Sequence, residues 1–435
     1  MRVNEHPLRR QVVAEMHLRR WPVLEAPCEV LQVLRIVPEA LRGAERAALA
    51  DLPAGGWLAP GDNPRHAEGG WPGGLGFVWE QHSEACAITL FVPAGADARA
   101  ACGWLETFPG QTIRASRIIV VPDEAAAQAL LPDLGFVASD LVSCHIGPPL
   151  ADGARVRLWS DFRIGAQGLG VALVAANGLP AGDLGRLLQR FQELGNYRNL
   201  ALMGLPVAQA QWPRLDSAEQ ALRVLADDLA NPALTDDALL ERVSALSLDL
   251  IALATETGYR LSATDAYAQL VEERLEGLAC GPVAGYPSLE DFTQRRLLPA
   301  TRTVQAYARR LDVLSGRAAH FASLLRTRVE TRIENQNARL LRSMERSASL
   351  QLRLQQLVEG LSVVALSYYG LSLLGYMLKG AEHHFAHFPG AEITGALVPV
   401  VVGAMWWGLH RLKARVLGGH GEPPAKGLDA GAQVL

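Results

Sequence analysis

Residues 360–378 are GLSVVALSYYGLSLLGYML, 19 residues without a charge, and residues 393–409 are ITGALVPVVVGAMWWGL, another 17. At about 1.5 Å of rise per residue, a helix over the first stretch can cross a hydrocarbon core of about 30 Å, and the second can only just do so. A helical hairpin buried in a soluble protein is the other structure that such a pair can form. The charged flanks favour the membrane. We therefore predict a transmembrane hairpin over 357–410, with helices at 357–378 and 393–410.

Basic residues lie outside the hairpin on both sides, whereas the loop between the two stretches, 379–392, contains only Lys379. Basic residues are retained on the cytoplasmic side of a membrane protein, so we expect both chain termini there and the loop outside. The flanking basic residues are Arg339, Arg342, Arg346 and Arg353 before the hairpin and Arg411, Lys413 and Arg415 after it.

The composition of the 435 residues narrows the class of protein. A net charge of −4 gives no global argument for a nucleic-acid partner. Five cysteines are scattered without CxxC spacing, which fits a reduced cytosol and neither a zinc site nor a disulfide framework. The charged opening has no apolar core of the kind found in a signal peptide. We therefore expect the large N-terminal part of the protein to stay in the cytosol.

Residues 1–179 predict a cytosolic α+β domain with α/β-like character. Its clearest feature is a hairpin of 75–81 and 84–92, two β-prone runs joined by two residues. A Gly/Pro-rich segment, 53–74, is expected to be a long surface loop. The DFR triplet at 161–163 is expected to form an ion pair at a strand end. The other predicted strands are 29–37, 117–121, 140–146, 155–162 and 170–176, and the helices are 39–49, 96–107 and 123–131.

Residues 180–298 predict a helical region interrupted at Pro206, Pro213, Pro232 and Gly258, and 299–356 predict a long stalk helix. Apolar residues recur three and four apart in the stalk, which is typical of a coiled coil and predicts a homo-oligomer. They are Val304, Tyr307, Leu311, Leu314, Ala318, Phe321 and Leu325. Residues 411–435 are expected to form a basic and then flexible cytoplasmic tail.

A second heptad enters the first membrane segment and is mostly small or polar. Hydroxyl and amide side chains avoid lipid, so this stripe should face protein or a water-filled cavity. One interpretation is a helix interface, in which the stripe packs against the first helix of another copy or against the second helix of the hairpin. The other is a pore, in which the stripe lines a channel and its glutamines lie at the cytoplasmic mouth. Its polar members are Gln351, Gln355, Ser362, Tyr369, Ser372 and Tyr376.

The outer loop is rich in groups that attract cations. His383 and His387 would share a face if the loop were helical, and such a pair can bind zinc or copper. The alternative is a solvated loop that concentrates cations electrostatically. The candidate residues are Glu382, His383, His384, His387 and Glu392.

Several stretches resemble a bacterial family of membrane-anchored proteins known as domain of unknown function 3422. They are NEHPLRR at 4–10, FVWEQHSE at 77–84, DFR at 161–163, YRNLALMGLP at 197–206 and VEGLSVVALSYYGLSLLGY at 358–376. The resemblance covers almost the full length. It implies a bacterial inner-membrane location, but it brings no assigned activity and no catalytic residues.

The layout is also similar to that of the CorA magnesium channels, which join an N-terminal α/β domain to a long stalk helix and two spans. That similarity would imply a homopentamer that conducts divalent cations. However, the Gly-Met-Asn filter is absent, and Gly375, Tyr376 and Met377 stand at its place.

We therefore expect a homo-oligomeric inner-membrane protein with a non-enzymatic role, as a sensor or scaffold. A CorA-like divalent-cation channel is the alternative, and a divalent cation is the one cofactor class that it implies. No nucleophile and base, metal cluster or phosphate loop stands out, so we predict no catalytic residues. The expected partners are membrane lipid and further copies of the chain, not nucleic acid.

Overall fold

The computed structural model describes residues 4–15, 21–60, 63–151, 153–382 and 390–417. The chain divides into two compact units, the first ending at Arg326 and the second beginning at Thr327.

The first unit is built on one mixed sheet with the described strand order β10-β7-β8-β9-β6-β1-β5-β4-β3-β2. Strands β6 and β9 pair in parallel, whereas β1 pairs antiparallel with both β5 and β6. The strands are β1 Cys28–Ile36, β2 Trp57–Leu58, β3 His66–Gly70, β4 Gly76–Gln81, β5 Ala85–Pro93, β6 Gln111–Val121, β7 Val142–Ile146, β8 Val156–Ser160, β9 Gly170–Ala175 and β10 Gly281–Pro282.

The predicted hairpin is confirmed as β4 and β5, which pair from Gly76 and Phe91 to Gln81 and Cys86. The expectation of one long loop over 53–74 is wrong, because β2 and β3 extend the sheet there. A Cβ on Gly69 would lie 2.1 Å from the carbonyl oxygen of Trp57. Only glycine allows this close approach, so the strand lacks the β-branched signature that a sequence pattern detects.

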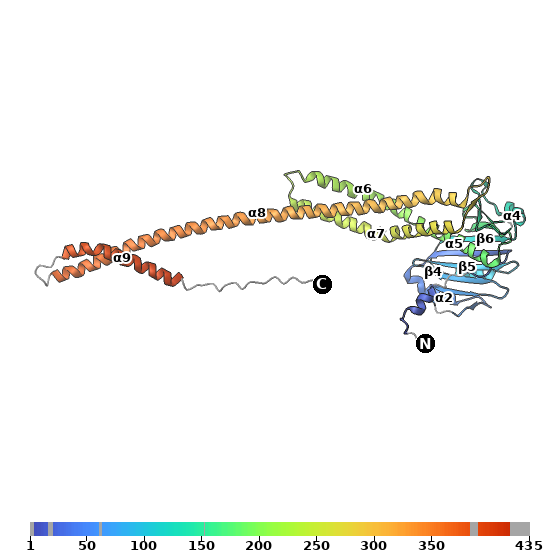
Figure 1. Ribbon diagram of the computed structural model, residues 1–435, viewed down its shortest axis with the longest axis horizontal. Helices are drawn as coiled ribbons and strands as arrows, with labels where there is room; N and C mark the ends of the chain where they lie inside the picture. The colour runs from blue at the N-terminus through green and yellow to red at the C-terminus, as the bar shows by residue number, and fades with distance from the viewer. Residues whose placement is uncertain (1–3, 16–20, 61–62, 152, 383–389, 418–435) are drawn as a thin grey trace. The chain divides into compact units, whose positions relative to one another are not determined.

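Helices cover both faces of the sheet (Figure 1). On one face, α2 (Arg42–Ala50) and α3 (Arg99–Glu106) enclose an aromatic core in which Trp79 Nε1 donates to Glu45 Oε1 at 3.0 Å. A smaller cluster lies under α4 (Glu124–Leu130). On the other face, α5 (Ala181–Leu202) packs with the end of α7 and the start of α8. A short helix, α1 (Arg9–Glu15), precedes β1.

The later helices are longer than the sequence predicts. They are α6 Gly204–Asp228, α7 Asp236–Gly277, α8 Leu289–Glu382 and α9 Gly390–Leu417. Pro213 lies inside α6 and Gly258 lies inside α7, so the expected interruptions at these two residues are wrong. Pro206 lies in the first turn of α6, close to the break between α5 and α6. Pro213 is exposed, and so is Gln209, whose carbonyl loses its intrahelical donor and can bond water instead. A single glycine costs only about 1 kcal/mol in a helix, which packing along a 42-residue helix outweighs.

The apolar heptad of the predicted stalk is buried within the chain. Tyr307, Leu314 and Leu325 are fully buried and pack against residues of α6 and α7, such as Leu215 and Val243. Figure 1 shows α6, α7 and the start of α8 side by side. The heptad spacing therefore marks a buried face of α8, and α6 and α7 of the same chain cover it.

In the second unit, α8 and α9 are both long and apolar enough to cross a membrane, by length and composition. They pack through small residues, because Gly370 leaves room for Val401 and Met405, whose side chains lie 3.7 Å from where a Cβ would stand. Ser367, one turn earlier, is buried at 3% exposure.

Candidate functional site

The polar stripe of α8 does not face α9. Tyr369 and Tyr376 are 69% and 76% exposed, and Gln351 and Gln355 are exposed as well. Ser362 Oγ donates to the carbonyl of Val358 at 2.8 Å within its own helix. Ser372 is half-buried. Because α9 packs on the neighbouring face with Ser367 and Gly370, the stripe is left without a partner from the described part of the hairpin.

The outer-loop candidates cannot be placed. His383, His384 and His387 lie outside the described residues, as do the side chains of Glu382 and Glu392. Within the described part of the chain, no group of three or more His, Cys, Asp or Glu side chains is arranged to hold a metal ion.

A site that the sequence analysis missed lies in the first unit, between the sheet and α5. Arg114 of β6 donates from Nη1 to Gln32 Oε1 at 3.1 Å and to Asn196 Oδ1 at 3.0 Å. Its Nη2 donates to Gln192 Oε1 at 2.5 Å. A Cβ on Gly195 would lie 2.7 Å from the Arg114 guanidinium, so glycine lets α5 pass over it. All three acceptors are neutral amides, and therefore the charge of Arg114 has no counterion among them.

A second arginine, Arg198 of α5, lies beside aromatic rings. Its Cζ is 4.6 Å from the ring centroid of Phe162 and 5.4 Å from that of Phe292, and the two rings stack at 4.5 Å. Arg296, one turn further along α8, lies 4.2 Å from the Phe292 ring. Stacking occupies the face of a guanidinium and leaves the N–H donors in its plane available. Among the described residues, no carboxylate contacts Arg114, Arg198 or Arg296.

Burial and mutual repulsion act on these arginines together. Burial, and then the charge of Arg198, lowers the pKa of Arg114 to about 9. Burial, and then the charge of Arg296, lowers the pKa of Arg198 to about 10. A buried cation normally has an anionic partner, because desolvation of an unpaired charge opposes folding. The site thus carries a positive charge for which the described protein provides no compensation.

Arg114 and Arg198 both line a pocket of about 210 Å³. Its wall also contains hydroxyl and amide groups from Ser116, Ser160 and Asn199, whereas no Asp, Glu, His or Cys is among its lining residues. Ser116 Oγ, Ser160 Oγ and Asn199 Nδ2 donate to Gln192, Val171 and Gly195 within the protein. The donors that this lining can offer to a small oxyanion are therefore the remaining N–H groups of Arg114 and Arg198.

Phe162 and Arg163 of the DFR triplet line the pocket, and an ion pair lies at the strand end as expected, although not between Asp161 and Arg163. Arg163 instead pairs with Asp140 at 2.5 Å, and Asp161 accepts the backbone N–H groups of Val137 and Arg163. Phe162 has φ +54°, a strained value for an aromatic residue. Its N–H donates to Ser160 Oγ at 3.1 Å, which helps to hold the strained turn. Such strain is found where a side chain must be held in one direction, and here that direction is toward Arg198.

A family model described as a protein of unknown function (DUF3422) matches residues 4–416. The chain belongs to this family. No curated protein matches its sequence. The DUF3422 description assigns no activity and does not mention the CorA channels. Two of the stretches quoted for the resemblance, DFR and YRNLALMGLP, contain Phe162 and Arg198. Both residues line the pocket of Arg114 and Arg198, which we call the arginine pocket.

One signal in the sequence could have indicated this site. Arg114 and Ser116 alternate along β6 with the same period as Ile118 and Val120, which are buried under α5. A period of two places all four on one face of the sheet. An arginine on the buried face of a strand is uncommon unless it is paired.

Proposed function

We propose that this DUF3422 protein is a membrane-anchored, non-enzymatic sensor that binds a small oxyanion-bearing ligand in the pocket of Arg114 and Arg198. The observation that supports it is the pair of partly buried, mutually repelling guanidinium groups without a carboxylate partner in the described chain. A bound phosphate, sulfate or carboxylate would supply the missing charge through charge-assisted hydrogen bonds.

The position of the pocket favours a signalling role. Phe292 is in the first turn of α8, and it contacts both Phe162 and Arg198. The same helix continues to Glu382 and includes a segment apolar enough to span a membrane. A ligand that orders the start of α8 would therefore act on the helix that forms the first proposed span. In this proposal both termini are cytoplasmic, and the membrane is the bacterial inner membrane.

The exposed stripe of α8 supports self-association as part of the same proposal. Tyr369 and Tyr376 would otherwise present phenol hydroxyls to lipid, where they find few hydrogen-bond partners. Contact between first spans of different copies would satisfy them. The same exposure favours the second candidate function, a divalent-cation channel lined by this stripe, since pore-lining side chains also lie outside intrachain contacts.

Thermal unfolding of the full-length protein in detergent micelles tests the proposed ligand class. Phosphate, sulfate and acetate are compared with chloride at equal ionic strength. We expect an oxyanion to raise the melting temperature, because a ligand that binds only the folded state stabilises it by about 2.7 kcal/mol at 100 times its dissociation constant. No shift with any oxyanion would contradict the proposal.

Arg198→Met distinguishes a ligand site from a structural arginine. The variant keeps the contact with the phenylalanine rings but removes the unpaired charge, so the unliganded protein should be at least as stable as wild type. Its oxyanion response should disappear. Arg186→Met is the matched control, because Arg186 is exposed on the same helix and pairs with Asp183. Lower stability of unliganded Arg198→Met, together with an unchanged oxyanion response, would overturn the assignment.

A further inference from the structure

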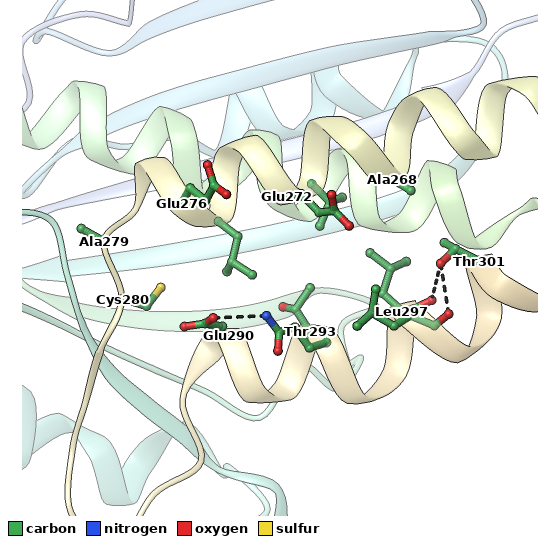
Figure 2. A pocket seen from close by; sticks show the side chains of 13 residues that line it. Ala268, Glu272, Glu276, Ala279, Cys280, Glu290, Thr293, Leu297 and Thr301 are labelled. Carbon is green, nitrogen blue, oxygen red and sulfur yellow. Dashed lines mark hydrogen bonds between the residues drawn. The ribbon is translucent and has the colours of Figure 1, made fainter.

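A second pocket, of about 500 Å³, lies between the last turns of α7 and the first turns of α8. Figure 2 shows Glu272 and Glu276 on one helix across from Glu290 and Thr293 on the other. The arginine pocket shares none of its lining residues. The two pockets are therefore separate sites in the first unit.

The charge of this pocket is opposite to that of the first. Glu272, Glu276 and Glu290 all line it, and no Arg, Lys or His does. Glu290 accepts a hydrogen bond from Gln294 Nε2 at 3.1 Å, whereas no basic side chain of the described chain pairs with any of the three. Glu272 and Glu276 also lie near the C-terminal end of α7, where the helix dipole favours cations over anions. The pocket is thus arranged to attract positive charge.

Thr293 gives an independent indication that this pocket can bind a ligand. It is 2% exposed, and its Oγ1 has no hydrogen-bond partner among the described residues. A helical threonine usually bonds back to a preceding carbonyl, as Thr301 does to Leu297 at 3.2 Å. The hydroxyl of Thr293 makes no such bond, although an unsatisfied buried polar group opposes folding. Because Thr293 lines the pocket, a ligand there can supply the partner.

Much of the remaining wall is apolar, although Gln294 and Thr301 also line it. Val271, Leu275 and Leu297 are buried and line the pocket, and they would contact hydrocarbon and not a hydrated ion. No group of three or more His, Cys, Asp or Glu side chains in the described chain can hold a metal. A ligand that satisfies both features carries ammonium groups on an aliphatic chain.

We propose that this pocket binds an aliphatic di- or polyamine. One ammonium group would lie against Glu272 and Glu276 and a second near Glu290, while the methylene chain covers Leu275 and Leu297. An N–H of the ligand would donate to Thr293 Oγ1.

Isothermal titration of the full-length protein in detergent micelles with spermidine and with 1,5-diaminopentane tests this site. Wild-type protein should bind both, whereas 1,5-pentanediol, which lacks the charge, should not bind. Magnesium chloride serves as a second probe. Absence of amine binding at millimolar concentration, or magnesium binding as tight as that of the diamine, would overturn the proposal.

Two variants and a matched control locate the binding. The double variant Glu272→Gln/Glu276→Gln should weaken amine affinity by about tenfold or more, as expected for loss of charged hydrogen bonds. Glu273→Gln is the control, because Glu273 lies on the same helix with its side chain 65% exposed and is not among the lining residues. Equal affinity of the double variant and the control would contradict the assignment.

Thr293→Val tests the hydroxyl without changing the shape of the side chain. The unliganded variant should melt at or above the wild-type temperature, because the hydroxyl has no partner to lose, and its amine affinity should fall severalfold. A lower melting temperature with unchanged amine affinity would show that the hydroxyl has a structural role instead. Arg198→Met should bind amines like wild type, which separates this result from the oxyanion test.

Discussion

Two stretches of α8 share the same spacing of three and four residues but have different surroundings. Between Val304 and Leu325, the heptad positions are large and apolar, and α6 and α7 of the same chain cover them. Between Gln351 and Tyr376, the heptad positions are mostly small or polar, and the described part of α9 leaves most of them exposed. A heptad thus indicates which face of a helix is available for packing, but it does not tell which element packs on that face.

The difference has a physical cause. Large apolar side chains at 304–325 gain roughly 1.5–3 kcal/mol each from burial, so the nearest apolar helices pack on them. In a membrane, lipid is as apolar as leucine, and helices instead pack through close approach of small residues. Gly370 provides such an approach to α9, and therefore the intrachain contact forms beside the polar stripe and not on it.

Removal of the chain from Leu357 onward should have the largest effect, because it deletes the hairpin and leaves the first heptad in place. Because the first heptad is covered within the chain, residues 1–356 should form a folded, soluble monomer, whereas the full-length protein should require detergent. Light scattering coupled to size exclusion measures the mass. A stable oligomer of this fragment would mean that the first heptad has a second partner, and recovery only as aggregate would contradict its independence from the hairpin.

Leu314→Ala tests how tightly the first heptad is covered. Leu314 is 1% exposed, and a buried Leu→Ala change costs about 2–5 kcal/mol, so the free energy of unfolding should fall by that amount. Val313→Ala is the control, because Val313 is 51% exposed in the same turn. Denaturant unfolding can be followed by tryptophan fluorescence, to which Trp212 contributes from beside the Tyr307 ring at 5.7 Å. An equal decrease in the free energy of unfolding for both variants would contradict this packing of Leu314.

The double variant Ser362→Leu/Ser372→Leu tests the second heptad. In the self-association proposal both serine hydroxyls bond to another copy, Ser362 as an acceptor because it donates to Val358 of its own helix. Each such bond in a membrane is worth about 0.6 kcal/mol, so the oligomer dissociation constant should rise roughly fivefold to tenfold while folding is unaffected. Val364→Leu, off the stripe, is the control. Divalent-cation flux into proteoliposomes is measured in parallel. Flux that the double variant loses with its oligomer intact would favour the channel alternative, and an unchanged oligomer without flux would leave the stripe unexplained.

Ser367→Ala should have the smallest effect. Ser367 is buried beside α9, and its Oγ has no partner among the described residues. Replacing an unpaired hydroxyl should change hairpin stability by less than about 1 kcal/mol, in either direction. Thermal unfolding in micelles measures the change. A loss of several kcal/mol would mean that this hydroxyl contributes to the contact between α8 and α9.

The sequence predicts the elements of this fold better than their extents and partners. The pattern of β-branched residues predicts the strands that contain them, but it does not predict β3, because Gly69 and Gly70 give that strand no side-chain pattern. Pro213 and Gly258 predict helix ends that packing overrides. The two apolar segments were located by length alone, and the structure has helices there.

The arginine pocket could not be predicted as a site from the sequence. Arg114, Phe162, Arg198 and Phe292 come from four elements or loops that only the folded sheet and α5 bring together. Local spacing carries no information on such contacts. The alternation of Arg114 with buried residues of β6 predicts its face, but not that its neighbours are amides and a second arginine.

The titration of Arg114 gives the most direct test of the proposed oxyanion site. Its pKa of about 9 in the folded protein is below the ordinary value of 12.5, so at neutral pH the protonated group lowers the free energy of unfolding by its full amount. This destabilisation should decline as the pH rises through about 9, because the folded protein then loses the proton. Binding of an anion requires the proton and should show the opposite trend.

The decisive measurement is the affinity for sulfate, whose charge is constant in this range, between pH 7 and about 10.5 by titration calorimetry. The proposal predicts a constant affinity up to about pH 8 and a fall that approaches tenfold per unit above about 9, with proton uptake on binding. Arg198→Met should not bind at any pH. Affinity that stays constant to pH 10.5, or binding that persists in Arg198→Met, would contradict the central claim that these two arginines hold an oxyanion.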